Sequence, residues 1–260
     1  MNHLEDIVSY LKTDVLKHIV HLKMIEAYAG QIIGHYERHN SQVGIALLIP
    51  TLASPFDAQT YPNSDFIVLL AATDPEILQY IILQIPRKTN LVFKFVDAMT
   101  RQIILQRFPA QRVTAYLSYT TQEPRFHSHP SVVMSNRLDK HILPCYLENG
   151  YTSQAMARYF EQGAMSFTIS DQAQPLSTCF AFRNYEAVWE IGGVYTAAFQ
   201  RRQGLAKRVV ETALHQVLDR GWTPRYQVRE TNQPSIRLAE ALGLKPFVVT
   251  EHFFYDAAST

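Results

Sequence analysis

The stretch that decides the fold runs from residue 190 to residue 206 and reads EIGGVYTAAFQRRQGLA. An apolar segment, about 189–196, is predicted to be a strand, and 197–203 is predicted to be a turn. A helix is expected to start near Gly204, because apolar residues then recur every four positions and share one face. These apolar residues are Leu205, Val209, Ala213 and Val217. Gly221 follows them, as a C-terminal cap would.

This strand–turn–helix junction suits a polyanion such as a diphosphate. The first N–H groups of a helix lack internal partners, and the helix dipole adds about half a positive charge there. Gly204 has no Cβ, so a phosphate can approach the backbone closely. Arg201, Arg202 and Lys207 add positive charge, and Ala206 keeps the next turn small.

Two motifs resemble those of the GCN5-related N-acetyltransferases (GNAT). Arg201-x-x-Gly204-x-Ala206 is similar to the pyrophosphate loop of that family. The segment NQPSIRLAEALGL, from Asn232 to Leu244, is similar to a second family motif, with Leu244 where phenylalanine is usual. It starts 28 residues after Gly204 (232 − 204), which leaves room for one helix, one turn and one strand. The resemblance covers roughly residues 131 to 260 and predicts an α/β (α+β) fold with a mixed, largely antiparallel central sheet flanked by helices.

The resemblance implies acyl transfer from acetyl-coenzyme A to an amine, without a metal. It implies that the coenzyme's pantetheine arm pairs with the exposed edge of the strand before the loop, at Val194 and Thr196. The glycine pair 192–193 predicts a β-bulge, which would expose the Val194 N–H as an oxyanion donor. The residues expected to bind the coenzyme are Val194, Tyr195, Thr196, Arg201, Arg202, Gln203, Gly204, Leu205, Ala206, Lys207, Asn232 and Ser235.

Glu190 precedes Gly204 by 14 residues (204 − 190), which matches the base of the histone-acetylating branch of the family. A carboxylate on an apolar strand is costly unless it is exposed, paired or functional, so a structural or substrate-positioning role is the alternative. Many members carry a tyrosine acid where this chain has Ala239, which leaves the acid unassigned. Tyr195, Tyr226 and Tyr255 are expected near the cleft, and Asn232 and Ser235 are equally well explained as the start of a helix.

The order of strands and helices expected in the first half predicts that this half is a degenerate copy of the same fold. It runs strand 65–72, helix from Asp74, strand 90–96 and helix 99–108, in the same closing order as the second half. The segment 51–64 is expected to be a loop. Asp74 stands where the phosphate loop would begin, so this half is not expected to bind the coenzyme. The expected domains are 1–124 and 132–260, joined by a linker at 125–131.

Composition limits the other classes of function. The chain has 260 residues, of which 47% are hydrophobic and 18% charged, so a packed globular protein is expected. A net charge of +1 implies no general nucleic-acid surface, and the longest apolar run, 66–72, is shorter than a membrane span needs. Cys145 and Cys179 show no secretory framework and are expected to be reduced, in a cytoplasmic protein.

Two pairs of histidines are candidate metal ligands. His18 and His21 lie three residues apart on an expected helix, but no third ligand is evident, so surface or rim positions are favoured. His127 and His129 lie in the expected linker, where exposed imidazoles or a substrate entrance are both compatible with the sequence.

The sequence therefore favours an N-acyltransferase for a small-molecule amine or an amino acid, loosely similar to two-half glycine N-acyltransferase-like members. The alternative is a catalytically inactive acyl-coenzyme A-binding regulatory module, given Ala239 and Leu244. A nucleotide-phosphate binder fits the turn but not the second motif. The sequence does not name the acceptor or the acyl chain, and it leaves a homodimer open.

Overall fold

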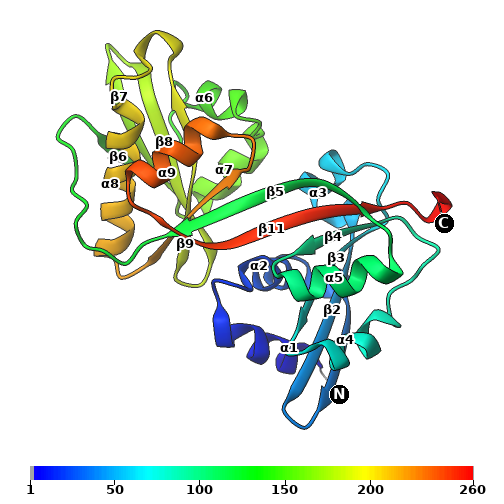
Figure 1. Ribbon diagram of the computed structural model, residues 1–260. Coiled ribbons are helices and arrows are strands. Elements are labelled where there is room, and N and C mark those ends of the chain that lie inside the picture. The colour runs from blue at the N-terminus through cyan, green and yellow to red at the C-terminus, as the bar shows by residue number, and fades with distance from the viewer. Residues whose placement is uncertain (1–2, 260) are drawn as a thin grey trace. The chain divides into compact units, whose positions relative to one another are not determined.

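The computed structural model describes residues 3–259, and these divide into two units (Figure 1). Unit 1 runs to Leu117 and is completed by the residues from Val248 on, whereas unit 2 is Ser118–Phe247. These boundaries differ from the expected 1–124, 125–131 and 132–260. The expected linker lies in unit 2, where the His129 N–H donates to Thr212 Oγ1 over 3.0 Å. The last strand joins unit 1 because its side chains are part of that unit's core, a long-range pairing that no local pattern encodes.

Unit 1 contains a mixed sheet with the strand order β1-β2-β3-β4-β11-β5. Pairing is antiparallel between β1 and β2 and between β2 and β3, parallel between β3 and β4, and antiparallel between β4 and β11. The strands are β1 (Ile33–His39), β2 (Gln42–Pro50), β3 (Phe66–Ala72), β4 (Leu91–Phe95), β5 (Gln111–Thr120) and β11 (Lys245–Tyr255). The helices are α1 (His3–Leu11), α2 (Ile19–Tyr28), α3 (Pro55–Thr60), α4 (Pro75–Ile82) and α5 (Ala98–Arg107).

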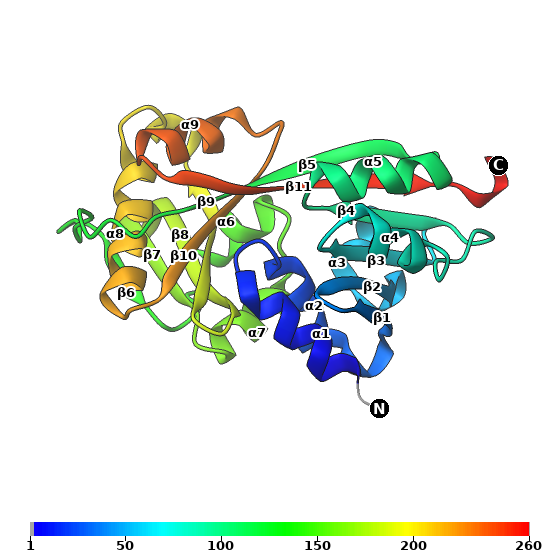
Figure 2. The same cartoon turned by 60° about the horizontal axis from the view of Figure 1, so that its bottom comes forward.

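Helices cover both faces of the sheet of unit 1 (Figure 2). A Cβ built on Gly44 would meet Ile77 and Ile81 of α4, whereas one built on Gly34 would meet Ile7 of α1. On the α4 side, side chains from β2, β3, β4, α4, α5 and β11 form one buried apolar cluster. This burial on both faces explains the nearly continuous apolar runs of β2 and β3.

Unit 2 has the strand order β5-β10-β9-β8-β7-β6. Pairing is antiparallel from β6 through β9 and parallel between β9 and β10. Its further strands are β6 (Val133–Ser135), β7 (Met165–Asp171), β8 (Gln174–Tyr185), β9 (Val188–Thr196) and β10 (Thr223–Arg229). Its helices are α6 (Leu143–Glu148), α7 (Ser153–Glu161), α8 (Leu205–Asp219) and α9 (Gln233–Ala241).

The sheet of unit 2 is also covered on both faces (Figure 1). Tyr146 of α6 and Met156 of α7 pack with Phe180 and Phe182 in one buried cluster, while α8 packs on β7, β8 and β9. The helix α8 ends as expected, because Gly221 adopts φ 71° and its N–H donates to the Leu218 carbonyl over 2.9 Å.

The predicted fold class is confirmed, because both units are mixed, largely antiparallel sheets flanked by helices. In each unit a run of antiparallel pairings, two in unit 1 and three in unit 2, leads to one parallel pairing whose two strands are joined by a helix. That helix is α4 between β3 and β4, and α8 between β9 and β10. This common order supports the interpretation of the first half as a second, altered copy of one fold.

Local patterns misled the prediction at two places in unit 1. The expected loop 51–64 contains the helix α3, which begins after Ser54, whose hydroxyl accepts from the Asp57 N–H. The expectation of surface positions for His18 and His21 was wrong, because both side chains are buried. His21 Nε2 lies 3.0 Å from the Leu70 carbonyl oxygen. Burial is the main reason that the pKa falls to about 3 for His21 and to about 4 for His18, so both are neutral at pH 7.

Candidate functional site

The junction between β9 and α8 has a backbone shape that suits an anion. Gly204 is the N-cap of α8 with φ 76°, and no side chain caps the helix there. Arg202 also has a positive φ, 64°, which is uncommon for a residue with a side chain. Alternation of left-handed and other residues turns successive N–H groups toward one point, as in the backbone nests that bind phosphate.

The N–H groups of this junction are free among the residues that the structure describes. At the start of α8 the Arg208 N–H donates to the Gly204 carbonyl over 3.2 Å. The N–H groups of residues 203–207 have no acceptor in the described chain. Arg201, Arg202, Gln203, Gly204 and Lys207 are exposed, Ala206 is half-buried and Leu205 is buried. The structure therefore brings the predicted diphosphate residues together and leaves them open to a ligand.

The strand β9 carries the expected bulge at its glycines. Its register with β8 shifts between the pairs Thr178–Tyr195 and Phe180–Gly192, which leaves one extra residue in β9. Gly193 adopts φ 61°, and a Cβ on it would lie 2.6 Å from Phe180 Cε1. Only glycine fits there, because a side chain would meet both an unfavourable φ and a buried ring.

Past the bulge, one edge of β9 has no strand beside it in the described pairings. The pairing with β10 ends at Ile191–Tyr226. The Ala197 N–H donates to the carbonyl of Leu176 in β8, so strand alternation turns the N–H groups of Val194 and Thr196 to the opposite edge. This edge leads directly to the loop before α8. Residues 194–196, for which pantetheine binding is predicted, therefore lie on an edge with free backbone donors.

Side chains fix the carbonyl groups of this edge. Asn149 Nδ2 donates to the Val194 carbonyl over 3.3 Å, and Arg201 Nε donates to the Thr196 carbonyl over 3.2 Å. On the opposite side, which faces β8, Ser177 Oγ donates to the Tyr195 carbonyl over 2.8 Å. The strand end is therefore held rigid while its N–H groups at 194 and 196 stay available. Arg201 thus has one structural contact besides the predicted role at the diphosphate.

Glu190 is half-buried and already has two partners. Its Oε2 accepts from Asn184 Nδ2 over 2.6 Å and from the buried guanidinium of Arg225. Arg225 NH2 also donates to Ser118 Oγ over 3.2 Å. Among the described residues, Glu190 Oε1 has no hydrogen-bond partner. A role as base therefore depends on Oε1, while Oε2 supports the structural role that was the alternative.

The second motif forms the start of α9. Asn232 is its N-cap, and its Oδ1 accepts from the Ser235 N–H over 3.2 Å. Ser235 is also hydrogen-bonded to the buried Tyr226, whose pKa burial raises to about 12. The helix-start interpretation of Asn232 is confirmed, and its amide nitrogen is left for a ligand. Tyr226 is engaged and buried, which makes it a poor proton donor.

The other tyrosines named from the sequence differ in position. Tyr195 is half-buried on β9, and burial is the first cause of its raised pKa. Tyr255 belongs to the core of unit 1, where its hydroxyl donates to the Arg87 carbonyl over 3.1 Å. Ala239, at the usual tyrosine position, is fully buried. A buried alanine, which has no proton to donate, therefore occupies the position where the general acid was expected.

Sequence reasoning missed three side chains of this region. Arg225 lies opposite Glu190 in the parallel register of β10 and β9, and a charge on each of two buried strands was the available signal. Asn149 precedes a glycine, a pattern typical of a turn, and nothing near it in the sequence indicates its contact with Val194. Tyr151 lies beside the glycine pair, since a Cβ on Gly192 would be 2.9 Å from its hydroxyl oxygen. Nothing local in the sequence indicates that contact.

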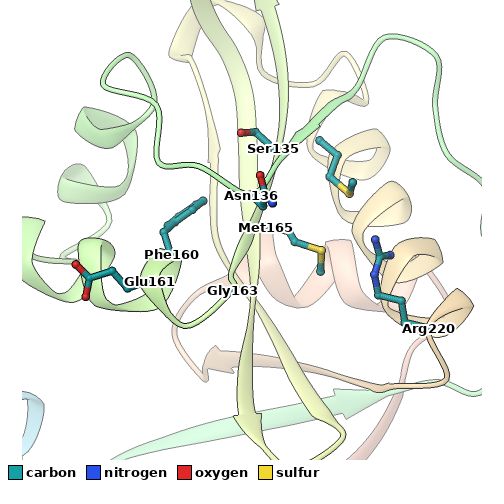
Figure 3. A pocket seen from close by; sticks show the side chains of 8 residues that line it. Ser135, Asn136, Phe160, Glu161, Gly163, Met165 and Arg220 are labelled. Atoms are coloured by element: carbon teal, nitrogen blue, oxygen red, sulfur yellow. The ribbon is translucent and has the colours of Figure 1, made fainter.

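A hollow of about 500 Å³ in unit 2 lies away from this junction. Phe160, Met165 and Arg220 help to line it (Figure 3). Arg220 follows the C-terminal end of α8, whereas the free N–H groups are at its start, about 22 Å away for 15 residues. The hollow is therefore separate from the candidate coenzyme site.

Comparison with known proteins identifies the class. Residues 136–248 match the family model of the GNAT acetyltransferases, the family that the two sequence motifs resemble. The chemistry of that family is acyl transfer from acyl-coenzyme A. A search of the curated proteins finds no match.

Solved structures support the fold over nearly the whole chain. An acetyltransferase of the GNAT family from Colwellia psychrerythraea is 11% identical with a TM-score of 0.59, and the match covers 94% of this chain and 97% of that one. A GCN5-related N-acetyltransferase from Kribbella flavida is 14% identical with a TM-score of 0.56, covering 92% and 95%. A tandem GNAT protein from the clavulanic acid biosynthesis pathway is 11% identical with a TM-score of 0.55, covering 92% and 87%. At these identities the likeness shows the fold, and the tandem protein supports the division into two halves.

Within residues 3–259 the structure contains neither a cluster of metal ligands nor a helix that could span a membrane. No group of three or more histidine, cysteine, aspartate or glutamate side chains in this range could hold a metal ion. None of the helices in this range is both long and apolar enough to cross a membrane.

Proposed function

We propose that the protein transfers an acetyl group from acetyl-coenzyme A to the primary amine of a small molecule or an amino acid. The observation that carries the proposal is two sets of N–H groups without acceptors among the described residues. One set is Val194 and Thr196 on the open edge of β9, and the other is residues 203–207 at the start of α8. The first set can pair with the amides of pantetheine and the second with two phosphates of the coenzyme.

In this proposal each group at the junction has one task. The N–H groups of residues 203–207, with Arg201, Arg202 and Lys207, hold the diphosphate. The Val194 N–H donates to the oxygen of the thioester as negative charge develops on it. Glu190 Oε1 accepts a proton from the attacking amine, directly or through water.

A small acceptor is proposed because the fold is divided into two halves, as in the tandem GNAT protein of the clavulanic acid pathway. That relative works in the synthesis of a small molecule by its own description, and the acceptor of this chain is inferred by analogy. We also propose a cytoplasmic location, since Cys145 and Cys179 are unpaired and buried.

The test is thiol release from acetyl-coenzyme A over a panel of amines and amino acids, together with calorimetry of coenzyme binding. Glu190→Gln is expected to lower turnover at neutral pH by about 100-fold, with coenzyme affinity retained, because the amide cannot accept the proton. Thermal unfolding of this variant must be measured as well, because Arg225 would lose the charge of its buried partner. Unchanged kinetics in a folded variant would reject the base assignment.

The second candidate is a coenzyme-binding module without catalysis. Two observations favour it: buried Ala239 stands at the usual tyrosine position, and Glu190 is tied to Arg225. Coenzyme binding with no thiol release on any amine of the panel would support this candidate against the first.

A further inference from the structure

The side chain of Tyr151 lies beside the glycine pair of the β9 bulge. Tyr151 lies between α6 and α7, and its ring packs on Phe180 with centroids 5.2 Å apart and planes at 78°. Its hydroxyl oxygen is 2.9 Å from the point where a Cβ of Gly192 would stand. A side chain at 192 would push the hydroxyl away, so glycine at this position is what allows the contact.

The same hydroxyl interacts with the backbone of Gly193, the residue before the proposed oxyanion donor Val194. That interaction favours the ionised phenol, so the backbone group involved is a donor, the N–H. The hydroxyl oxygen then accepts from the chain, while its own proton has no acceptor among the described residues. Tyr151 therefore presents a free O–H donor within one peptide unit of Val194.

We propose that the Tyr151 hydroxyl and the Val194 N–H together form the oxyanion hole of the acyl transfer. This assignment rests on the proposed function, because it places the thioester carbonyl against the bulge. As the amine nitrogen bonds to the carbonyl carbon, one electron pair of the C=O bond moves to the oxygen, where both groups donate to it. When the pair returns, the C–S bond breaks, coenzyme A leaves as the thiolate, and the amine proton is passed on through Glu190 or water to neutralise it.

The environment of Tyr151 makes it a hydrogen-bond donor that keeps its proton. Burial first, and the Glu190 carboxylate second, raise the pKa of the Tyr151 phenol well above its usual value of 10. A thiolate has an ordinary pKa of about 8.5, so proton transfer from this phenol to the leaving sulfur is uphill. A phenol that stays protonated beside a developing negative charge stabilises it without transferring the proton.

Tyr151→Phe tests the assignment, with Tyr159→Phe as the matched control. Tyr159 also packs on Phe180, with centroids 5.7 Å apart, so both variants remove one hydroxyl from the same aromatic cluster. Tyr151→Phe is expected to lower kcat about 100-fold while the KM for acetyl-coenzyme A changes less than about threefold. The pH–rate profile should keep its shape, since no titrating acid is lost. Tyr159→Phe should stay within about threefold of the wild type in both constants.

A second measurement needs no acceptor. The carbonyl of bound acetyl-coenzyme A, labelled with ¹³C, resonates downfield when donors polarise it. Tyr151→Phe should return the resonance toward the free value, and Tyr159→Phe should not. If thiol release and coenzyme binding are intact but Tyr151→Phe matches the wild type in kcat and in this resonance, only the Tyr151 assignment fails. If the wild-type protein does not bind the coenzyme, the proposed function fails, and the Tyr151 assignment with it.

Discussion

Two strand-to-helix junctions occupy corresponding places in the two units and end in opposite ways. Before α4, Asp74 Oδ1 accepts from the N–H groups of Glu76 and Ile77 over 3.0 and 3.2 Å. Before α8, Gly204 offers no side chain and the first N–H groups stay free. One junction is closed by a carboxylate of its own chain, and the other is open to a carboxylate or phosphate from outside.

The strands that lead to these junctions also differ, because β3 is regularly paired with its neighbour β2 whereas β9 carries a bulge. The register of β2 and β3 runs from Pro50–Phe66 to Gly44–Ala72 without a shift. The register of β8 and β9 shifts at the glycine pair. A regular strand pairs its backbone evenly, whereas a bulge turns N–H groups toward a ligand. Two junctions of similar fold therefore differ in whether the first N–H groups of the helix have partners among the described residues.

The largest expected effect is on coenzyme affinity, and it comes from placing an aspartate at the N-cap of α8, as Asp74 stands at the N-cap of α4. Gly204→Asp should weaken coenzyme A binding roughly 100-fold, because the carboxylate would accept the free N–H groups and repel the diphosphate. A Cβ at 204 meets nothing within 4 Å, and aspartate tolerates the left-handed backbone, so the fold should be retained. Calorimetry measures the affinity.

Gly204→Asn is the matched control for that substitution, since asparagine has the same shape and also tolerates this backbone. It should bind coenzyme A within about tenfold of the wild type, because the repulsion between like charges is absent. Equal affinities for the two variants would show that charge at the cap does not separate the two junctions.

A smaller effect, on stability, is expected from a substitution that disfavours the bulge of β9. Gly193→Ala should lower the free energy of unfolding by about 2–4 kcal/mol, because the new methyl group meets Phe180 at a positive φ. Gly204→Ala, where the space is open, should cost only about 1 kcal/mol. Trp189 and Trp222 are the two tryptophans of the chain and stack in unit 2, so tryptophan fluorescence in urea follows this unit. A loss at Gly193→Ala no larger than at Gly204→Ala would mean that the bulge relaxes freely.

The smallest effect concerns the cap of unit 1. The cap residue is Asp74, and its pKa is lowered from 3.8. The hydrogen bond that the Thr73 hydroxyl donates to it is the main cause, followed by those from the N–H groups of Ile77 and Glu76. The ionised side chain therefore stabilises the folded state above pH 3.8, and this contribution is lost as the pH falls through the lower, folded-state pKa. Asp74→Asn should unfold at a lower urea concentration than the wild type at pH 7. The difference between the two urea midpoints should become smaller in acid, because the wild-type carboxylate is then protonated. Far-ultraviolet circular dichroism measures both, and a difference that grows as the pH falls would contradict the assignment.

Asp74→Gly in the Gly204→Asp background completes the comparison. It should not restore coenzyme binding, because β3 has no bulge that presents N–H groups along its edge. Restored binding would show that the cap alone, and not the shape of the strand, decides which junction takes a ligand.

The sequence by itself determined the features that depend on neighbours along the chain. Periodicity placed α8, the glycine pair placed the bulge, Asp74 with Pro75 placed the capped helix, and the loop at 201–206 with the segment 232–244 identified the family. Each of these signals is local, because helix caps, turns and strand glycines act through residues a few positions away.

Tertiary structure decided the features that depend on partners distant in the chain. The residues from Val248 on complete the core of unit 1, Arg225 occupies one oxygen of Glu190, and Tyr151 approaches Gly192. The burial of His18 and His21 belongs to the same class, since a histidine at helical spacing looks the same whether or not a sheet covers it. Such contacts follow from how sheets and helices pack, and no short stretch of sequence specifies which residue will stand opposite another.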